Sequence, residues 1–435
     1  MDSQMADRSS SEGTSHEHRA LAGFLTEASE AEIQASLSFH QAKIEKSQLP
    51  GEHLSIPEIL ERIRLAEKAQ EILDDEKGKN PNAKYPPLEL SLIHFSYFIY
   101  ADKDALKSLV EVHPVGPAPF LESRMRNIEN FLCLMLQKLN GPIDSDALGN
   151  LPASENNSSG SEYQPTVNDV DGIRTINRNV KEADEARSRD ANCIATNCAE
   201  FQVCHILPFT VNNTASKLKT ARKIFISVIA PLMSEKDWHA TEALVVPRSR
   251  EIGTSDRRWN LVALNHLAHA LWNKGYFALE WIGVEGVEPE TGEYLKVKLR
   301  WHWLTNRIPE ALEQAYLGEK GPTKGHAGRA VKFGTDHQGM AVAIKKCLDS
   351  TRTASASANG VSLCRMANHR PLITGDVLNI RVKLEDVEKT RLMIEIQWLA
   401  LKMAAFCAAA EVVDELDPEP LHLEELSTYW DFEMS

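Results

Sequence analysis

The chain has 435 residues, a formal net charge of −14, 43% hydrophobic residues and 25% charged residues. This length can hold two or three domains with a buried core, and the composition is that of a globular protein. The seven cysteines are too few and too scattered for a small disulfide-stapled secreted domain, which indicates a reducing compartment. The polar N-terminus does not resemble a signal peptide, and Lys402 interrupts the most apolar long run, 398–413, so an intracellular protein, nuclear or cytoplasmic, is expected.

The acidic charge is concentrated at the two ends of the chain. Residues 1–170 carry a formal charge of −12 and residues 411–435 carry −9, whereas residues 171–410 carry +7. Nucleic-acid binding depends on Lys and Arg contacts to phosphate, so the net charge argues against it and the basic middle argues for it. A solvated surface with ordinary charge scatter would give the same count. Six basic residues are close in sequence to the candidate site described below: Lys217, Lys219, Arg222, Lys223, Arg257 and Arg258.

The N-terminal part of the chain is expected to be helical. Residues 1–20 offer little apolar surface to bury and are expected to be disordered. Residues 21–140 are expected to form a helical module, with helical spacing from Ala31, a helix after the Ser55 N-cap, and another over 124–139. The apolar run 88–100 fits either a buried helix or a strand.

A polar segment divides the chain. Residues 141–172 are rich in Ser, Asn, Gly, Pro and Asp, and such a composition cannot bury enough apolar surface to order itself. We interpret this segment as a flexible linker. A second domain is then expected over 173–415, followed by an acidic tail over 416–435.

Two stretches of the second domain carry the chemically informative residues. Residues 201–209, FQVCHILPF, form an apolar run with His205 near its end, and residues 259–280 carry Asn260 and, nine residues later, His269. Residues 259–264 alternate well enough for a strand, and Asn265 can cap a helix that runs to about residue 273. For either histidine alone, a packed or exposed structural role is favoured. The ordered set His, Asn, His favours a site.

The remainder of the second domain is expected to add helices and strands around this unit. Residues 218–233 and 235–246 are predicted to be inserted helices, and period-two alternation predicts a hairpin over 278–304. Trp301 and Trp303 are expected on one side of it and His302 on the other, at the surface or edge. Residues 370–386 are predicted to form a strand pair and residues 390–413 a long buried helix.

From about residue 187 to 415 the chain resembles the HNH endonuclease domain proteins common in fungi. The resemblance rests on the opening RDANCIATN, the boxes CHILPF and WNLVALNHLAHALWNKGYFAL, the strand pair ending KLRWHWL, and the distal segments GDVLNI and IQWLALKMAAFCAAAEV. It covers about half of the chain, and the two boxes are specific only when taken together. The resemblance implies an α+β fold in which the helical N-terminal module precedes an HNH ββα-metal core elaborated with extra helices and a β-hairpin.

The resemblance also implies roles for individual residues. His205 would be the general base that polarises the attacking water, and His269 would be a metal ligand. Asn260 would either bind the metal or pin the loop that orients His205. His266, one helical turn before His269, is a candidate second ligand outside the family box. The implied cofactor is a divalent metal ion, Mg²⁺ or Zn²⁺, which neutralises charge on phosphate oxygens.

Cys204 departs from the family pattern. Many HNH enzymes have an acidic residue or a second histidine immediately before the base, where it binds the metal, and this chain has Cys204 there. A thiolate prefers soft ions such as Zn²⁺, whereas Mg²⁺ prefers oxygen. Three interpretations stay open: a buried apolar cysteine, which is favoured, a softer ion shared with His269, or a weakly held metal.

Two functions follow as expectations. The first is a metal-dependent HNH endonuclease that hydrolyses phosphodiester bonds in DNA, with RNA as a further candidate, through His205, Asn260 and His269. The second is a catalytically degenerate HNH-fold module that binds nucleic acid or protein, suggested by Cys204 and the net acidity. No membrane partner is expected.

Overall fold

The computed structural model of the chain describes residues 54–79, 88–111, 117–136, 167–170, 173–176, 178–287, 293–304, 310–318, 328–350 and 360–409, together with residues 308 and 357. The expected disordered N-terminus (1–20), the helix expected from Ala31 and the acidic tail (416–435) lie outside the described residues. The described part combines helices with small antiparallel sheets, so the α+β class is confirmed.

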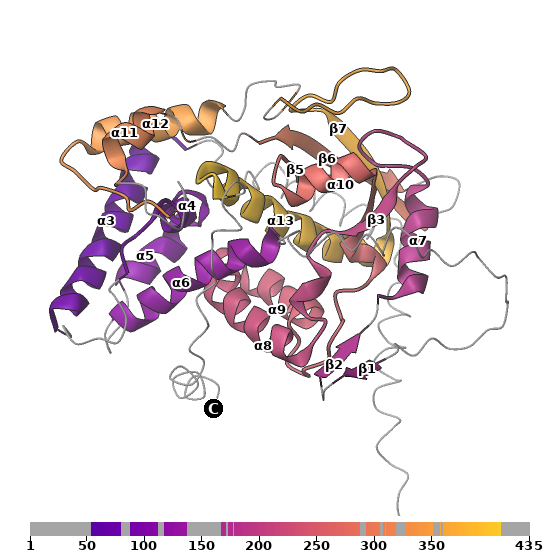
Figure 1. The fold of residues 1–435 in the computed structure, drawn as a ribbon, viewed down its shortest axis with the longest axis horizontal. Coiled ribbons are helices and arrows are strands. Elements are labelled where there is room, and N and C mark those ends of the chain that lie inside the picture. The colour runs from indigo at the N-terminus through magenta and orange to yellow at the C-terminus, as the bar shows by residue number, and fades with distance from the viewer. Residues whose placement is uncertain are drawn as a thin grey trace, which may run out of the picture.

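The N-terminal helices pack against one another on one side of the molecule (Figure 1). Ser55 begins the first helix as expected, since its hydroxyl accepts from the Glu58 backbone N–H and its own N–H donates to the Glu58 carboxylate at 2.7 Å. The run 88–100, which fitted a helix or a strand, contains a helix that is buried along its whole length. The helices are α3 (Ile56–Lys79), α4 (Leu92–Tyr100), α5 (Lys103–Glu111) and α6 (Pro117–Met135).

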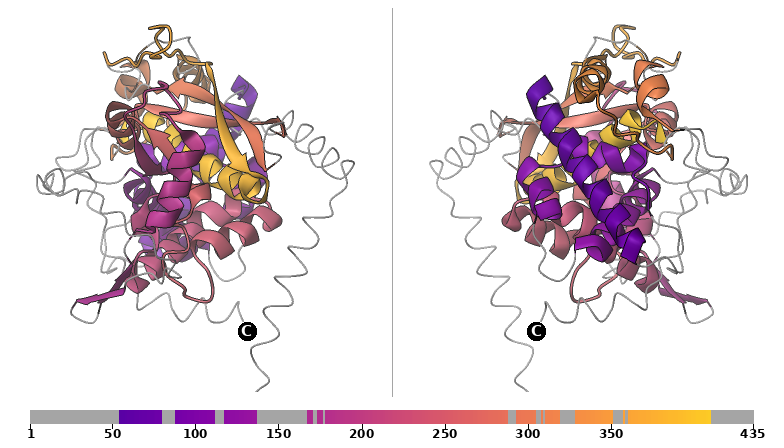
Figure 2. Two further views of the ribbon diagram at one scale, coloured as in Figure 1. Left: turned by 90° about the vertical axis from the view of Figure 1, so that its right-hand side faces the viewer. Right: turned by 90° about the vertical axis from the view of Figure 1, so that its left-hand side faces the viewer.

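A short hairpin lies where the linker was expected to end. Strand β1 (Val167–Val170) pairs with β2 (Ile173–Ile176) in an antiparallel ladder, so residues 167–170 of the predicted linker 141–172 are a strand. Figure 2 shows this hairpin projecting from the body of the protein. Residues 141–166 lie outside the described residues.

A strand–strand–helix unit follows. Helix α7 (Val180–Asp190) precedes β3 (Gln202–His205), which pairs antiparallel with β4 (Leu261–Leu264), and β4 leads directly into α10 (His266–Asn273). In Figure 1, α7 lies beside β3. The strand expected over 259–264 begins two residues later, because residues 258–260 form a single 3₁₀ turn, η5.

The long connection between β3 and β4 contains inserted helices, as predicted. The first, expected over 218–233, is divided into α8 (Ala215–Ile224), a π turn η3 (Phe225–Ile229) and a 3₁₀ turn η4 (Ala230–Leu232) that contains Pro231. Proline lacks the N–H needed to continue an α-helix, which explains the change of helix type. The second is α9 (Glu235–Val245). A 3₁₀ turn, η2 (Phe209–Val211), follows β3.

The larger sheet has the order β5 (Phe277–Val287), β6 (Tyr294–Trp303), β7 (Val377–Lys383), all antiparallel. Trp301 and Trp303 are fully buried on one face of the sheet, as the predicted hairpin requires. The Phe277 ring stacks on Trp301, with 3.8 Å between the ring centroids. The predicted strand pair over 370–386 is wrong: β7 is a single strand and its partner is β6. Gly375, with φ of 99°, turns the chain just before β7, so the preceding residues do not extend the strand.

A buried helix connects the N-terminal helices with the larger sheet. Helix α13 (Val387–Phe406) is buried along most of its length and contacts β5, α4 and α6, so it lies between the sheet and the N-terminal helices (Figure 1). This confirms the helix expected over 390–413 as far as Phe406; the chain turns at residues 407–408, and residues 410–413 lie outside the described residues. Helices α11 (Glu310–Tyr316) and α12 (His337–Ser350) complete the described fold, and α12 packs on α3. Within the described residues, no helix is both long enough and apolar enough to cross a bilayer.

Candidate functional site

The three residues of the motif lie on consecutive parts of the β3–β4–α10 unit. His205 is the last residue of β3 and pairs in register with Leu261, the first residue of β4. Asn260 immediately precedes β4, and its carbonyl accepts from the Ile206 N–H at 2.8 Å. His269 lies in the middle of α10, whose N-cap is Asn265, as expected; the Asn265 side chain accepts from the Ala268 N–H at 2.7 Å.

Asn260 holds the chain on both sides of the site. Its side chain is fully buried; its oxygen accepts from the Leu207 N–H at 2.8 Å, and its nitrogen donates to the Leu207 and Ser255 carbonyls, both at 3.0 Å. These bonds use both ends of the amide. They correspond to the second of the two roles considered for Asn260, in which it pins the loop that orients His205.

Asp256 is the partner of His205. His205 Nε2 donates to Asp256 Oδ1 at 2.7 Å, and the two side chains are only 6% and 5% exposed. The other oxygen, Asp256 Oδ2, accepts from the Asn179 backbone N–H, which lies at the start of α7. The loop sequence around Asp256 has no periodicity or motif that marks this residue, so sequence reasoning missed it. The Ser255–Asp256 segment is held near β3 by Asn260, which donates to the Ser255 carbonyl, and by Asn212, which accepts from the Ser255 hydroxyl at 2.7 Å.

The two groups alter each other's acidity. Burial lowers the pKa of His205 below its usual value, and the hydrogen bond and charge of Asp256 offset part of this effect. Burial by itself would raise the pKa of Asp256, but the hydrogen bonds from His205 and from the Asn179 N–H lower it. The pair is therefore a neutral imidazole beside a carboxylate at pH 7. Because the carboxylate accepts from Nε2, the imidazole lone pair is on Nδ1.

His269 is a neutral imidazole between two amides. Its Nδ1 is hydrogen-bonded to the Gln202 side-chain amide and its Nε2 to that of Asn273, at 3.1 Å. Burial, together with the positive charge of Arg178 and the repulsion from His266 and His205 when these rings are protonated, lowers the pKa of His269 to about 4. A neutral imidazole is the form that binds metal, but an ion on either nitrogen would displace one of these amides.

The other two candidate ligands lie in different surroundings. Cys204 is buried in the hydrophobic core, and burial raises the pKa of its thiol, so it is not a thiolate at pH 7. Successive residues of a strand point to opposite faces, so the Cys204 and His205 side chains diverge. His266 is exposed on the first turn of α10.

A divalent ion therefore finds few ligands in the described part of the protein. Asn260 uses both ends of its amide for backbone contacts, and Cys204 is a buried thiol. In the residues that the structure describes, no group of three or more His, Cys, Asp and Glu side chains is arranged to hold a metal ion. His269 is the candidate ligand closest in character to a metal-binding group. The donor set does not fit a metal ion held by protein side chains alone.

Half of the basic residues noted in the sequence form ion pairs. Arg222 pairs with Glu242 at 2.8 Å, Arg257 with Glu182 at 3.4 Å, and Arg258 with Glu185 and Asp386, both at 2.7 Å. The Arg258 group closes one side of an open cleft that is also lined by Glu182, Glu251, Glu385, Asp386, Arg257 and Lys389. Carboxylates outnumber cations in the lining of that cleft, and both of its arginines are engaged in ion pairs.

A hydrogen-bonded, partly buried histidine–carboxylate pair also lies on the larger sheet. His302 Nε2 is 3.0 Å from Glu280 Oε2, and the two side chains are 12% and 14% exposed. The expectation that His302 lies at the surface or edge is wrong, because its ring packs 4.7 Å from that of Trp398 on α13. Arg300 also donates to Glu280, at 2.9 Å. This carboxylate is thus shared between two basic side chains of one strand.

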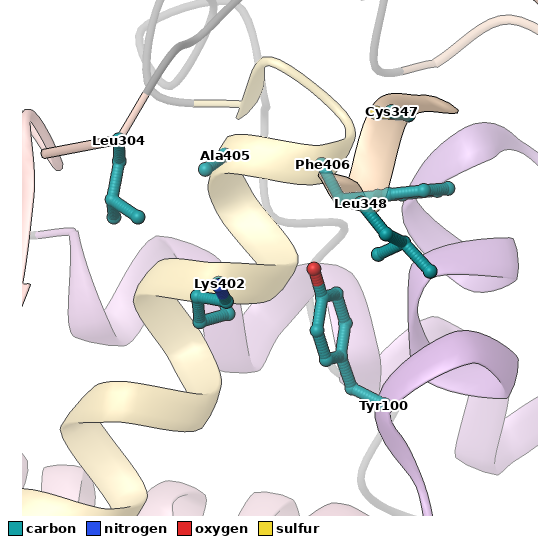
Figure 3. A pocket seen from close by; sticks show the side chains of 7 residues that line it. All are labelled: Tyr100, Leu304, Cys347, Leu348, Lys402, Ala405 and Phe406. Carbon is teal, nitrogen blue, oxygen red and sulfur yellow. The ribbon is translucent and has the colours of Figure 1, made fainter. Parts of the chain in front are cut away.

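A small cavity lies at the junction of α4, α12 and α13. Figure 3 shows the Tyr100 hydroxyl directed toward it and Lys402 on the neighbouring turn of α13. Its volume is about 10 Å³, enough for about one water molecule. Its lining shares no residue with β3, β4 or α10, so it is separate from the His205 site.

The geometry around His205, Asp256, Asn260 and His269 is the main functional observation for the described residues. Comparison of the chain with protein-family models, with curated proteins and with solved structures finds no match.

Proposed function

We propose that this protein is an HNH-type endonuclease that hydrolyses phosphodiester bonds in DNA, with His205 as the general base. The observation that carries the proposal is the 2.7 Å bond between His205 Nε2 and Asp256. It supports a base because an oriented, neutral imidazole with a lone pair on Nδ1 can accept a proton from water at neutral pH. The chain order adds support, because His205 ends β3, Asn260 immediately precedes β4 and His269 lies on α10.

Each residue of the site has a separate task in this proposal. Asp256 holds the His205 ring and stabilises the imidazolium that forms when Nδ1 takes the proton. Asn260 keeps the loop that carries Asp256 in place. His269 stays neutral, because its pKa is lowered to about 4. A divalent cation would neutralise charge on the phosphate oxygens. Since the described donors do not fit an ion held by protein alone, no step of the mechanism is assigned to it.

Plasmid cleavage tests the proposal. Supercoiled DNA is incubated with the full chain and, in turn, Mg²⁺, Mn²⁺, Ni²⁺ or Zn²⁺. His205→Ala should lower the cleavage rate about 10²- to 10⁴-fold, the usual contribution of a general base. The matched control is His302→Ala, which removes a histidine that is also hydrogen-bonded to a carboxylate and should leave the rate within about threefold. Equal cutting by wild type and His205→Ala would remove His205 from the mechanism.

A noncatalytic HNH-fold module is the second candidate, and two observations favour it. Cys204 is buried where many enzymes of this kind have a metal ligand, and both ring nitrogens of His269 are engaged by amides. This candidate predicts salt-dependent DNA binding without cleavage in any of the four metals. Cleavage that depends on His205 rejects it.

A further inference from the structure

Arg178 lies next to the His205–Asp256 pair through its own backbone. It directly precedes Asn179, which caps α7 with its side chain and donates its backbone N–H to Asp256 Oδ2. The residue that follows Arg178 is therefore a direct contact of the carboxylate that orients His205. This bond fixes the position of the Arg178 Cα relative to the candidate base.

The Arg178 side chain also lies near His205, beside the ring of Phe209. Its guanidinium carbon lies 5.8 Å from the centroid of the Phe209 ring, and the Phe209 ring lies 5.5 Å from that of His205. The arginine and the candidate base are thus neighbours of the same aromatic ring. The positive charge of Arg178 also lowers the pKa values of His205 and His269, so it acts electrostatically on both histidines.

Arg178 differs from the other arginines around the site. Arg189 pairs with Asp190 at 2.6 Å, Arg257 with Glu182 at 3.4 Å, and Arg258 with Asp386 at 2.7 Å. Arg178 is exposed, and no Asp or Glu among the described residues forms an ion pair with it. Its contact with Phe209 is a cation–π contact, which leaves the N–H groups of the guanidinium edge for an anion.

We infer that Arg178 binds the phosphodiester group on which His205 acts. A guanidinium presents two parallel N–H donors that match two non-bridging phosphate oxygens, so it can neutralise the group and orient it in one contact. At the cleft beside Arg258, by contrast, Arg257 and Arg258 are already paired with carboxylates, so Arg178 is the arginine near His205 that keeps its guanidinium edge for an anion. This inference rests on the proposed function and adds the residue that recognises the anionic substrate.

Hydrolysis of a small phosphodiester tests this role of Arg178 separately from general affinity for DNA. We propose to measure hydrolysis of bis(4-nitrophenyl) phosphate by wild type, Arg178→Ala, Arg178→Lys and Arg187→Ala. Arg187 is the matched control because it lies on α7, is exposed and pairs with Asp184. Arg178→Ala should lower kcat/KM about 100-fold, as loss of one positioned charge donor does. Arg178→Lys should restore part of the loss, because it keeps the charge without the fork. Arg187→Ala should match wild type.

Binding gives a readout that needs no turnover. In a His205→Asn background, the Kd of a short DNA duplex is measured over a range of salt concentrations. Arg178→Ala should raise Kd about tenfold and reduce the salt slope by about one, whereas Arg187→Ala should change neither. If Arg178→Ala and Arg187→Ala have equal Kd and equal kcat/KM, the inference about Arg178 is overturned. The proposed function would still stand in that case, provided that His205→Ala is inactive. Full activity of His205→Ala, or no duplex binding by wild type, would overturn both.

Discussion

The hydrogen-bonded pairs His205–Asp256 and His302–Glu280 differ in how they are built. His205 and Asp256 are 2.7 Å apart, and His302 and Glu280 are 3.0 Å apart. The second pair is formed within one hairpin, where Glu280 faces Arg300 directly across the strands and His302 lies diagonally. The first pair joins the end of a strand to a loop 51 residues later in the chain.

The surroundings of the two pairs differ more than their distances. Glu280 is shared with Arg300, and the His302 ring is covered by Trp398, so this pair completes the packing of α13 on the sheet. Asp256 is held by a backbone N–H, and the positive charge of Arg178 acts on both members of its pair. Short distance and low exposure therefore do not distinguish a candidate base from a structural histidine. The two pairs are distinguished by the partners of the carboxylate, which are a backbone N–H for Asp256 and a second basic side chain for Glu280.

The largest expected effect tests whether Asn260 is the support of the first pair. Asn260→Ala removes a buried amide that makes bonds to Leu207 and Ser255, which leaves backbone groups without partners. We expect the free energy of unfolding to fall by about 3 kcal/mol, because each buried unsatisfied group costs about 1–3 kcal/mol. Urea denaturation measures this change.

The control for this loss is another asparagine of the same unit. Asn265→Ala removes the N-cap of α10 and should cost about 1 kcal/mol. Two-dimensional NMR of the histidine rings should show His205 shifted in Asn260→Ala and His302 unchanged. If Asn260→Ala costs no more than Asn265→Ala, the loop has a support other than Asn260.

The next effect compares the two carboxylates. Asp256→Asn should lower DNA cleavage about 10- to 100-fold, as loss of a residue that orients an imidazole does, whereas Glu280→Gln should stay within about threefold. The charge and hydrogen bond of Asp256 raise the pKa of His205, so their removal lowers it. Because a general base must be neutral, the acid limb of the pH–rate profile should move to lower pH in Asp256→Asn. A shift to higher pH would contradict this assignment.

The strand–strand–helix unit could be predicted from sequence, but the pair at its centre could not. The apolar run ending at His205 and the capping residue Asn265 are local signals, and β3, β4 and α10 follow from them. Asp256 meets His205 only through the long insertion between the strands, and no local period encodes that contact. His302 was placed at the surface because alternation gives the face of a strand without showing what covers it; α13 covers it.

Arg178 shows a second reason for the limit of sequence reasoning. It follows the segment interpreted as a linker and belongs to neither of the two boxes that carry the resemblance. Its place beside Phe209 depends on the start of α7, which the Asn179 contact to Asp256 fixes. A residue of this kind becomes a candidate only after the fold has brought separate segments together.

The smallest expected effect concerns the loss of stability at acid pH that the buried His269 causes. Its pKa is lowered to about 4 in the folded protein, whereas an unfolded histidine has a pKa of about 6.5, so the unfolded state takes up the proton first. The free energy of unfolding should therefore fall as the pH decreases from about 6.5 to about 4, by about 1 kcal/mol after allowance for partial solvent contact. Urea denaturation at pH 7 and pH 4.5 measures the difference, with His269→Gln as the variant that lacks it and His239→Gln, an exposed histidine of α9, as the control. If wild type and His269→Gln lose the same stability between these pH values, His269 titrates normally, and the buried neutral imidazole assigned to α10 is wrong.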